Sequence, residues 1–297
     1  MELLQLQYFQ VIARTQNISA AAEQLHISQP SLSQILKRLE QEVGAPLFDR
    51  VGKRIVLNAY GAVLLKHVEK VFTALDNAAL EIQTLCGTAS KTVNLSILSA
   101  SMLLPDLYRE IKNTDPSILL HILQADQEHL PDADELIVSS DWKLPADTVS
   151  YHLLLEEEIQ LALPDGHPLL SKPYICLEDL NEESFISLSS DSSLARILSH
   201  YFTDRNFRPN ITTYIDNPDI MRKLLAAKIG LAFVPALTWH GMAANGVHMR
   251  QIENLPMRRY LLLRWNPNAF LTPAVIQCRD VIIRYFAAYW QEFFRPA

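Results

Sequence analysis

The sequence lacks the features that mark membrane, secreted and disulfide-bonded proteins. No run in its 297 residues reaches the roughly 18 apolar residues of a transmembrane helix. The N-terminus carries Glu2 and several glutamines instead of a basic start and an apolar stretch, which argues against a secretory signal. The three cysteines, Cys86, Cys176 and Cys278, are odd in number and far apart, so we expect no disulfide framework and no zinc motif. These absences predict a cytoplasmic protein with no membrane contact.

Catalytic signatures are also absent from the sequence. Gly occurs only 8 times, and there is no Gly-x-Ser-x-Gly, phosphate-binding loop or His-Glu-x-x-His motif. The 9 histidines are scattered, without a second His or Cys at metal-ligand spacing. Glu156, Glu157 and Glu158 resemble paired acids, but neighbours on a strand point to opposite faces, so we expect a solvated edge. The sequence therefore predicts no catalytic residue, metal or cofactor, and a protein that is not an enzyme.

Composition and charge indicate a globular chain of two or three domains. Hydrophobic residues make up 49% and charged residues 20%, as in folded soluble proteins. The net charge is -7, yet the first sixty residues hold six Lys/Arg against five Asp/Glu. A locally basic head on an acidic body is compatible with a nucleic-acid contact made by the head alone.

The N-terminal segment predicts a helix-turn-helix. Apolar periodicity and capping residues mark helices over 3–14, 20–25 and 29–42, with Asn17 and Ser28 as caps. The second and third helices are joined by a short turn, as in a helix-turn-helix. Amides and hydroxyls suit base edges, and cations suit phosphates. The alternative is a small bundle whose polar face is only solvated. The side chains expected on DNA are Ser28, Gln29, Ser31, Ser33, Gln34, Lys37 and Arg38.

A basic hairpin is predicted after the third helix. Residues 47–50 and 54–58 form short strands around a turn. Three cations gather at its tip: Arg50, Lys53 and Arg54. Beside a recognition helix, such a wing would contact the neighbouring backbone or minor groove.

These residues resemble a known family. The positions that carry the resemblance are Leu6, Phe9, Ser19–Ala22, Leu25, Ser28–Ser33, Ile35, Leu39, Glu40, Gly44, Leu47–Arg50 and Gly61. They resemble the winged helix-turn-helix of LysR-type transcriptional regulators. Asn58 stands where the family commonly has Thr, and both residues cap helices. The resemblance implies a sequence-specific regulator whose residues 1–58 bind double-stranded promoter DNA, with RNA polymerase as a candidate partner.

A long helix with a heptad seam is predicted next. Residues 59–85 contain no Pro, and apolar residues recur at alternating spacings of four and three. This seam favours a partner helix, although packing against the chain's own domain is an alternative. The resemblance implies a linker and dimerisation helix over 59–88, in a homodimer or a dimer of dimers. The pairing residues expected are Leu64, Val68, Val71, Leu75 and Ile82.

The remaining chain alternates strands with helices, which predicts α/β units with mainly parallel sheets. The expected strands are 93–98, 118–123, 135–139, 149–155, 159–163, 185–188, 211–215, 231–234 and 260–265. The expected helices are 103–112, 194–206, 218–227 and 272–294. The chain as a whole is therefore a multi-domain protein of mixed α+β and α/β class.

Polar residues gather where these strands end. In open α/β sheets ligands lie at the carboxyl ends of strands, near helix N-termini. Hydroxyls and helix-terminal N–H groups there suit an anion or a carboxylate, although turn and capping roles are the alternative. The residues in question are Ser99, Ser101, Ser139, Ser140, Ser189, Ser190, Asp216 and Asn217.

The resemblance extends into this part of the chain. Leu163–Leu169 and Gly230–Pro235 resemble the crossover and the Gly-to-Pro strand of the family's effector domain. That implies an effector-binding domain over 91–297 resembling periplasmic binding proteins, with a small-molecule effector between two subdomains and a carboxylate-bearing molecule among the candidates. Subdomain I would comprise 91–163 and 266–297, and subdomain II 164–265, with Phe233 beside the effector. Residues 124–134 depart from the family pattern.

Two readings from other classes compete with a regulator. One is a cytoplasmic solute-binding protein, which the basic head opposes. The other is an α/β enzyme-like protein with a DNA-binding appendage, which the missing nucleophile and cofactor motifs oppose.

Overall fold

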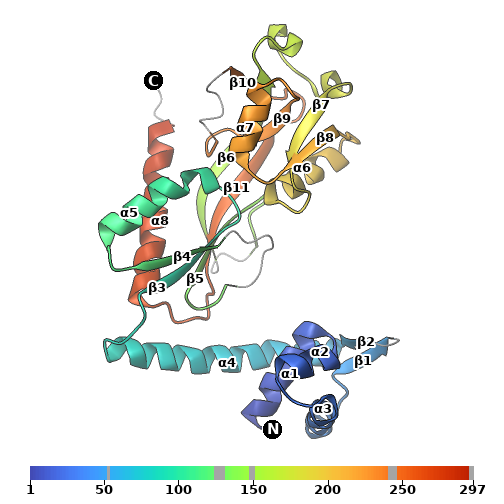
Figure 1. Cartoon of the computed structure of the whole chain (residues 1–297), viewed down its shortest axis with the longest axis vertical. Helices are drawn as coiled ribbons and strands as arrows, with labels where there is room; N and C mark the ends of the chain where they lie inside the picture. Colours follow the sequence, from blue (N-terminus) through green and yellow to red (C-terminus); the bar gives the residue numbers. More distant parts are fainter. Residues whose placement is uncertain (52–53, 124–130, 147–150, 240–245, 294–297) are drawn as a thin grey trace. The chain divides into compact units, whose positions relative to one another are not determined.

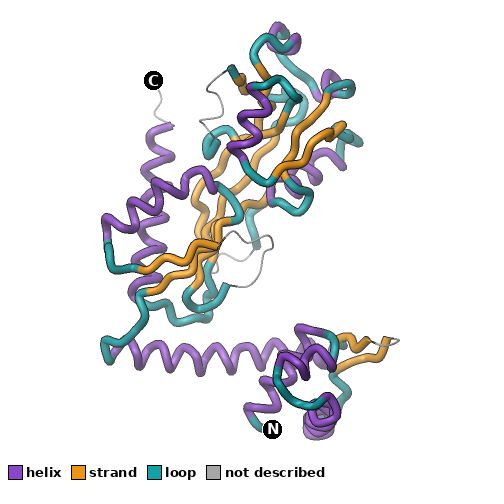
Figure 2. The backbone as a smooth tube through the Cα atoms, in the orientation of Figure 1, coloured by secondary structure: helices purple, strands orange, loops and turns teal. Residues whose placement is uncertain are grey.

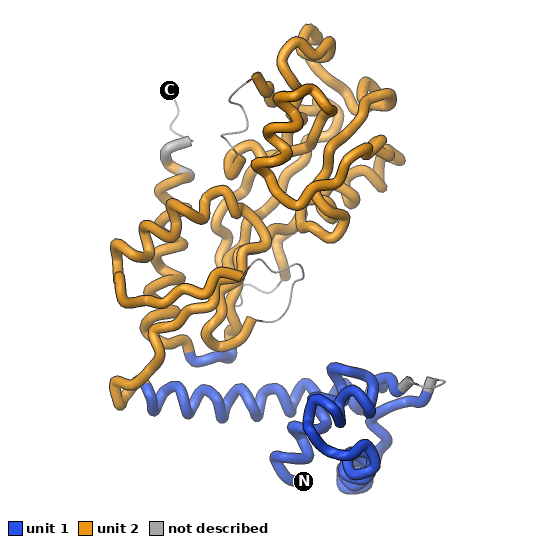
Figure 3. The backbone as a smooth tube through the Cα atoms, in the orientation of Figure 1, with its two compact units in different colours: residues 1–83, 268–270 blue, residues 84–267, 271–297 orange. Residues whose placement is uncertain are grey.

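The computed structural model describes residues 1–51, 54–123, 131–146, 151–239 and 246–293. The chain divides into two compact units (Figure 3). The first comprises residues 1–83 with 268–270, and the second comprises residues 84–267 with 271–297.

The first unit contains the three predicted helices, the hairpin and the long helix (Figure 1). In chain order the elements are α1 (Leu3–Thr15), α2 (Ile18–Gln24), α3 (Gln29–Val43), β1 (Phe48–Val51), β2 (Arg54–Leu57) and α4 (Ala59–Leu85). Their core consists of Leu6, Phe9, Ile12, Ala13, Ala21, Ala22, Leu32, Leu36, Leu39, Leu47, Phe48 and Val68. The helical periodicity seen in the sequence is therefore confirmed as the packing face of α1 and α3.

Side-chain caps set the start of three of these helices. The Asn17 carboxamide accepts from the N–H groups of Ser19 and Ala20 at the start of α2. The Ser28 hydroxyl accepts from Ser31 N–H at the start of α3. Asn58 accepts from Gly61 N–H at 2.9 Å, so Asn fills the capping role before α4 as expected.

Close packing of α4 against the hairpin requires a glycine at position 61. A Cβ added to Gly61 would overlap the carbonyl oxygen of Leu47 and lie 2.6 Å from the Leu57 side chain. The Leu47 carbonyl cannot move aside without shifting the backbone that leads into β1. Gly44 offers a contrast, because its φ is +80° and its surroundings are open.

Gly61→Ala is expected to lower the free energy of unfolding of the N-terminal unit by about 2–3 kcal/mol, through overpacking. Gly44→Ala meets only the cost of a left-handed backbone, about 1–2 kcal/mol. Hydrogen exchange of the α1 and α3 amides in the full chain measures both. A gain in protection for Gly61→Ala, as helix propensity alone would give, would contradict the packing argument.

The second unit is built on a sheet that is mixed rather than mainly parallel. In the described part of the chain, seven strands join it in the order β10-β6-β11-β5-β3-β4, with β9 also on β6 (Figure 2). The strands are β3 (Thr92–Ile97), β4 (Leu119–Leu123), β5 (Glu135–Asp141), β6 (Tyr151–Pro164), β9 (Ala232–Pro235), β10 (Val247–Arg250) and β11 (Met257–Arg264). Only β3 runs parallel to its neighbours β4 and β5, whereas β6 and β11 pair antiparallel. The expectation of mainly parallel sheets was therefore wrong for this sheet.

Strand β6 explains the error. The two strands expected at 149–155 and 159–163 are one strand, because no turn residue separates them and 156–158 continue the pairing with β11. Strand β11 returns beside β6 in the opposite direction. Strand β10 was not predicted, because an alternating run of only four residues is too short to be distinguished from a loop.

Helices and a small parallel sheet complete this unit. The small sheet pairs β7 (Ser184–Leu188) with β8 (Asn210–Ile215). The α-helices are α5 (Leu104–Thr114), α6 (Ser193–Thr203), α7 (Pro218–Ala226) and α8 (Pro273–Phe293), and three short 3-10 turns are η1 (Ser101–Leu103), η2 (Pro168–Ser171) and η3 (Leu177–Leu180). α5 packs beside α8, and α8 lies against β3, β5 and β6 (Figure 1).

Two hydrophobic cores divide the second unit. One includes Leu155 of β6 and Leu261 of β11, and the other includes Ile159 and Met257 on the same two strands. β6 and β11 therefore run from one core into the other. Each core reaches a few residues beyond the boundaries at 163/164 and 265/266 that the sequence suggested.

Candidate functional site

Helix α3 presents a polar face built by its amphipathic sequence. Leu32, Leu36 and Leu39 are buried in the first unit's core, which turns the opposite side of the helix outward. Ser28 is the N-cap, and its hydroxyl lies 2.7 Å from that of Ser31. These two serines therefore stabilise the N-terminal turn of α3, and both are exposed.

The remaining polar side chains of α3 are not used by the fold. Gln29, Gln34, Lys37 and Arg38 are exposed and Ser33 is half-buried. Among the described residues, none of the five makes a side-chain hydrogen bond or ion pair. Donors and acceptors left unpaired along one face of a helix are free for a ligand such as the edge of a base pair.

The hairpin forms the wing that the sequence predicted. β1 pairs antiparallel with β2, from Phe48 opposite Leu57 to Val51 opposite Arg54. The Arg50 side chain on β1 is exposed. Lys53 lies outside the described residues, and the Arg54 side chain is likewise not described.

The heptad seam on α4 divides into two parts. Val68 is 2% exposed and Leu64 packs against the same core, so these two side chains hold α4 on its own domain. The expected role of Val68 in pairing is therefore corrected, because this side chain is buried inside the chain. Leu64 is half-buried, and its pairing role stays a prediction. Further along, Val71, Leu75 and Ile82 are 41%, 48% and 60% exposed. The apolar part of the seam that is open to a partner begins at Val71.

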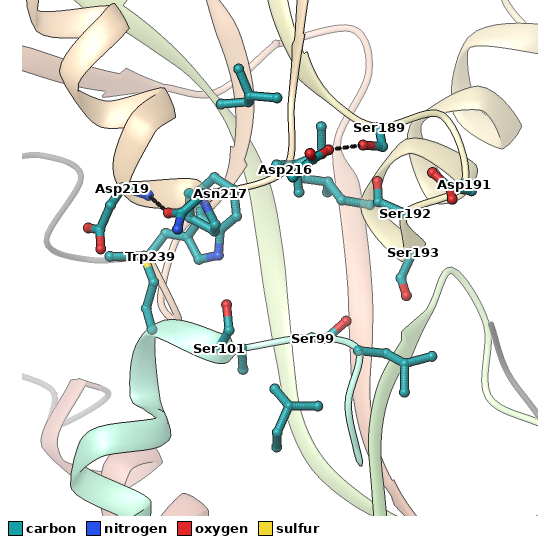
Figure 4. A pocket seen from close by; sticks show the side chains of 18 of the residues that line it. Ser99, Ser101, Ser189, Asp191, Ser192, Ser193, Asp216, Asn217, Asp219 and Trp239 are labelled. Carbon is teal, nitrogen blue, oxygen red and sulfur yellow. Dashed lines mark hydrogen bonds between the residues drawn. The ribbon is translucent and has the colours of Figure 1, made fainter. Parts of the chain in front are cut away.

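A cavity of about 490 Å³ lies where the loops after several strands of the second unit meet (Figure 4). Its walls include the residues following β3 and the starts of α6 and α7. The two helices begin there with N-caps Ser192 and Asn217. The volume falls within the range of small-molecule sites.

The structure brings five of the polar residues singled out at strand ends to this cavity. They are Ser99, Ser101, Ser189, Asp216 and Asn217. The Ser189 hydroxyl donates to the Asp216 carboxylate, and Ser99 lies 2.8 Å from Ser140, oxygen to oxygen. The hydroxyls of Ser101 and Ser99 lie on the opposite side of the cavity from Asp216 and Ser189 (Figure 4).

Three predicted residues lie elsewhere. Ser139 is fully buried in β5, and its hydroxyl has no hydrogen-bond partner in the described part of the chain. Ser190 and Phe233 line a second cavity, of about 440 Å³, beside α6. Phe233 is 5% exposed and stacks on Phe185 with ring centroids 5.4 Å apart, so its side chain packs in the core.

Sequence reasoning missed several cavity residues. They are Asp191, Ser192, Ser193, Asp219, Trp239 and Arg259. The serines and aspartates stand at helix starts, where strand-end reasoning could have found them. Trp239 and Arg259 carried no signal, because only the folded chain brings them together.

A buried ion pair stands at the cavity wall, where the sequence predicted a solvated edge. Glu157 and Arg259 have side chains 0% and 3% exposed, with 2.8 Å between carboxylate and guanidinium. Glu157 also accepts from the N–H groups of Leu237 and Thr238 and from the Thr238 hydroxyl. The expectation for Glu157 was wrong: alternation along β6 leaves its two neighbours at least partly exposed and turns this residue inward.

Two further properties limit what the described residues can do. They contain no group of three or more His, Cys, Asp and Glu side chains placed to hold a metal ion. Every helix among them is too short or too polar to cross a bilayer.

Both units of the chain match models of known protein domains. Residues 3–62 match the model of the bacterial regulatory helix-turn-helix protein, lysR family, and residues 87–287 match the LysR substrate binding domain. The uncharacterized HTH-type transcriptional regulator YybE of Bacillus subtilis is 30% identical, over 97% of this chain and 100% of its own length.

Two solved structures share the fold at low identity. Full-length CbnR, in a complex with its target DNA, is 17% identical with a TM-score of 0.51, covering 96% of this chain and 99% of that chain. The effector binding domain of QuiR, in complex with shikimate, is 19% identical with a TM-score of 0.51, covering 66% and 97%.

Proposed function

The chain belongs to the LysR family of transcriptional regulators, and on this premise we propose that it reads promoter DNA through α3 and the β1–β2 wing. It carries an effector-binding domain, and its relatives in the family are regulators, not enzymes. What remains to be proposed is which residues contact DNA, how two chains pair and where the effector binds.

The observation that carries the DNA-binding proposal is the unengaged polar face of α3. Gln29 and Gln34 offer amides that can pair bidentately with adenine, and Ser33 offers a hydroxyl. Ser31, whose hydroxyl lies 2.7 Å from that of Ser28, is exposed at the start of the same face. Lys37, Arg38 and Arg50 are exposed cations suited to the flanking phosphates. CbnR, which shares the fold, was solved on its target DNA.

We propose that α4 pairs two chains through its exposed seam from Val71 to Ile82. The helix has 27 residues and is about 40 Å long, which leaves room for the seam beyond the part packed on its own domain. Pairing would place two copies of α3 at a fixed spacing on the duplex. A dimer of dimers is the fuller assembly proposed.

We propose that the 490 Å³ cavity holds the effector. Helix N-termini and hydroxyls around it suit polar groups of a small molecule, a carboxylate among them. QuiR, which shares the fold of this domain, was solved with shikimate. The effector must bind two states of the regulator with different affinity, since equal binding shifts no equilibrium. The regulator would act in the cytoplasm, on promoters engaged by RNA polymerase.

Gln34→Ala is expected to relax the sequence preference at particular base pairs by about 1–3 kcal/mol, because it removes an amide that reads a base edge. Arg38→Ala is the matched comparison: it should weaken binding to all sequences alike and reduce the salt slope by about one. Selection of sites from random duplexes, followed by binding titrations of each variant at several salt concentrations, measures both effects.

The two variants test different parts of the proposal. Equal loss on every sequence for Gln34→Ala would contradict base reading by α3. An unchanged salt slope for Arg38→Ala would show that Arg38 does not contact a phosphate. The proposal that α3 reads bases would be unaffected.

A further inference from the structure

The cavity proposed to hold the effector is acidic. Three carboxylates line it: Asp191, Asp216 and Asp219. Among the described lining residues, Arg259 is the only Lys or Arg, and its guanidinium already pairs with the buried Glu157. Arg222, 3.7 Å from Asp219, offsets one of the three carboxylates in part. Free negative charge therefore exceeds free positive charge in this cavity.

The helix ends do not reverse this balance. α6 and α7 begin at the cavity, and each N-terminus carries a partial positive charge of about one half. Asp219 lies in the first turn of α7, and Asp191 directly precedes the N-cap of α6. The chain thus places its own carboxylates near these ends, where an anionic ligand would otherwise be stabilised.

Unpaired hydroxyls face the same space. Ser193 is only 5% exposed, and its hydroxyl points into the cavity (Figure 4). Neither Ser193 nor Ser101 makes a side-chain hydrogen bond to another described residue. Hydroxyls that line a cavity and have no partner among the described residues are available to a ligand. Hydroxyl and carboxylate oxygens accept hydrogen bonds, and an ammonium group brings three donors and no acceptor.

Resting on the proposed function of this cavity, we propose that the effector carries a protonated amino group bound by Asp216. Asp216 lies at the end of β8, and the Ser189 hydroxyl holds its carboxylate. Asp191 and Asp219 flank it and add to the negative potential. A carboxylate on the same molecule is compatible with this arrangement, at the Ser99 and Arg259 side. The ligand class is a small amine or amino acid.

Matched probes test the amino group directly. The full chain is heated with phenylalanine, leucine or glutamate, with the amine left by removing the α-carboxyl of each, and with the acid left by removing the amino group. Amino-bearing probes at millimolar concentration are expected to raise the unfolding midpoint by about 2–4 °C, and the deaminated acids are expected to leave it unchanged.

Two substitutions locate the effect. Asp216→Asn should abolish the shift given by amino-bearing probes. Asp204→Asn, the same change at the far end of α6, should retain it. Both residues are exposed, so the midpoint without ligand should stay the same in both variants.

Each remaining outcome counts against a defined claim. Two results would contradict the proposal that the effector carries an amino group bound by Asp216. One is stabilisation by the deaminated acids that persists in Asp216→Asn. The other is an unchanged unfolding midpoint with every amino-bearing probe. A shift that persists when Ser101→Phe obstructs the cavity would overturn the cavity as the effector site.

Discussion

Replacing Leu75 by Asp is expected to separate the paired chains and to lower the affinity for a complete DNA site by about 100-fold or more. Leu75 is 48% exposed on α4, between Val71 and Ile82 on the open part of the seam. A carboxylate there would have to be buried unpaired between two helices, which is costly. A single chain would keep one recognition helix and lose the gain in affinity that linked binding gives.

Light scattering of the variant and binding to a selected duplex measure the two consequences. Lys70→Asp is the control, because Lys70 is exposed on the same helix and lies off the seam. It should leave the oligomer intact. An oligomer of unchanged mass in Leu75→Asp would show that the seam is not the interface.

Replacing Glu157 by Leu is expected to lower the free energy of unfolding of the second unit by about 3–5 kcal/mol. The change leaves the Arg259 guanidinium, 3% exposed, without its carboxylate, and it removes the acceptor for the N–H groups of Leu237 and Thr238. Denaturant unfolding followed by tryptophan fluorescence measures the loss.

The adjacent residue supplies a matched control. Glu156 pairs with Arg258 at 2.7 Å on the surface, where the side chains are 34% and 55% exposed. Glu156→Leu should therefore cost less than about 1 kcal/mol. Similar losses for the two variants would contradict the account of Glu157 as the buried partner that holds Arg259 at the cavity wall.

The first unit was predicted closely because its signals are local. Apolar spacing set the helices, and Asn17, Ser28 and Asn58 act as the caps that their positions indicated. The exception is Val68, whose heptad spacing is the same whether the partner helix belongs to its own domain or to another chain.

The second unit was predicted in its elements and less well in its arrangement. Strand direction depends on which strands pair, and the pairing of β6 with β11 joins residues about a hundred positions apart. The same long-range pairing brings Glu157 to Arg259. Ser99, Ser101, Ser189 and Asp216 could be placed at the cavity because strand ends converge in α/β folds, whereas Trp239 and Arg259 come from segments with no such rule.

Footprinting of the full chain on a duplex selected from random sequences tests the central claim most directly, namely that paired chains present two copies of α3 to DNA. We expect two protected segments on one face of the duplex, with centres roughly 10 base pairs or a multiple of that apart. We also expect Gln34→Ala to weaken the same base positions in both segments. A single protected segment, or no protection at low salt, would contradict the account.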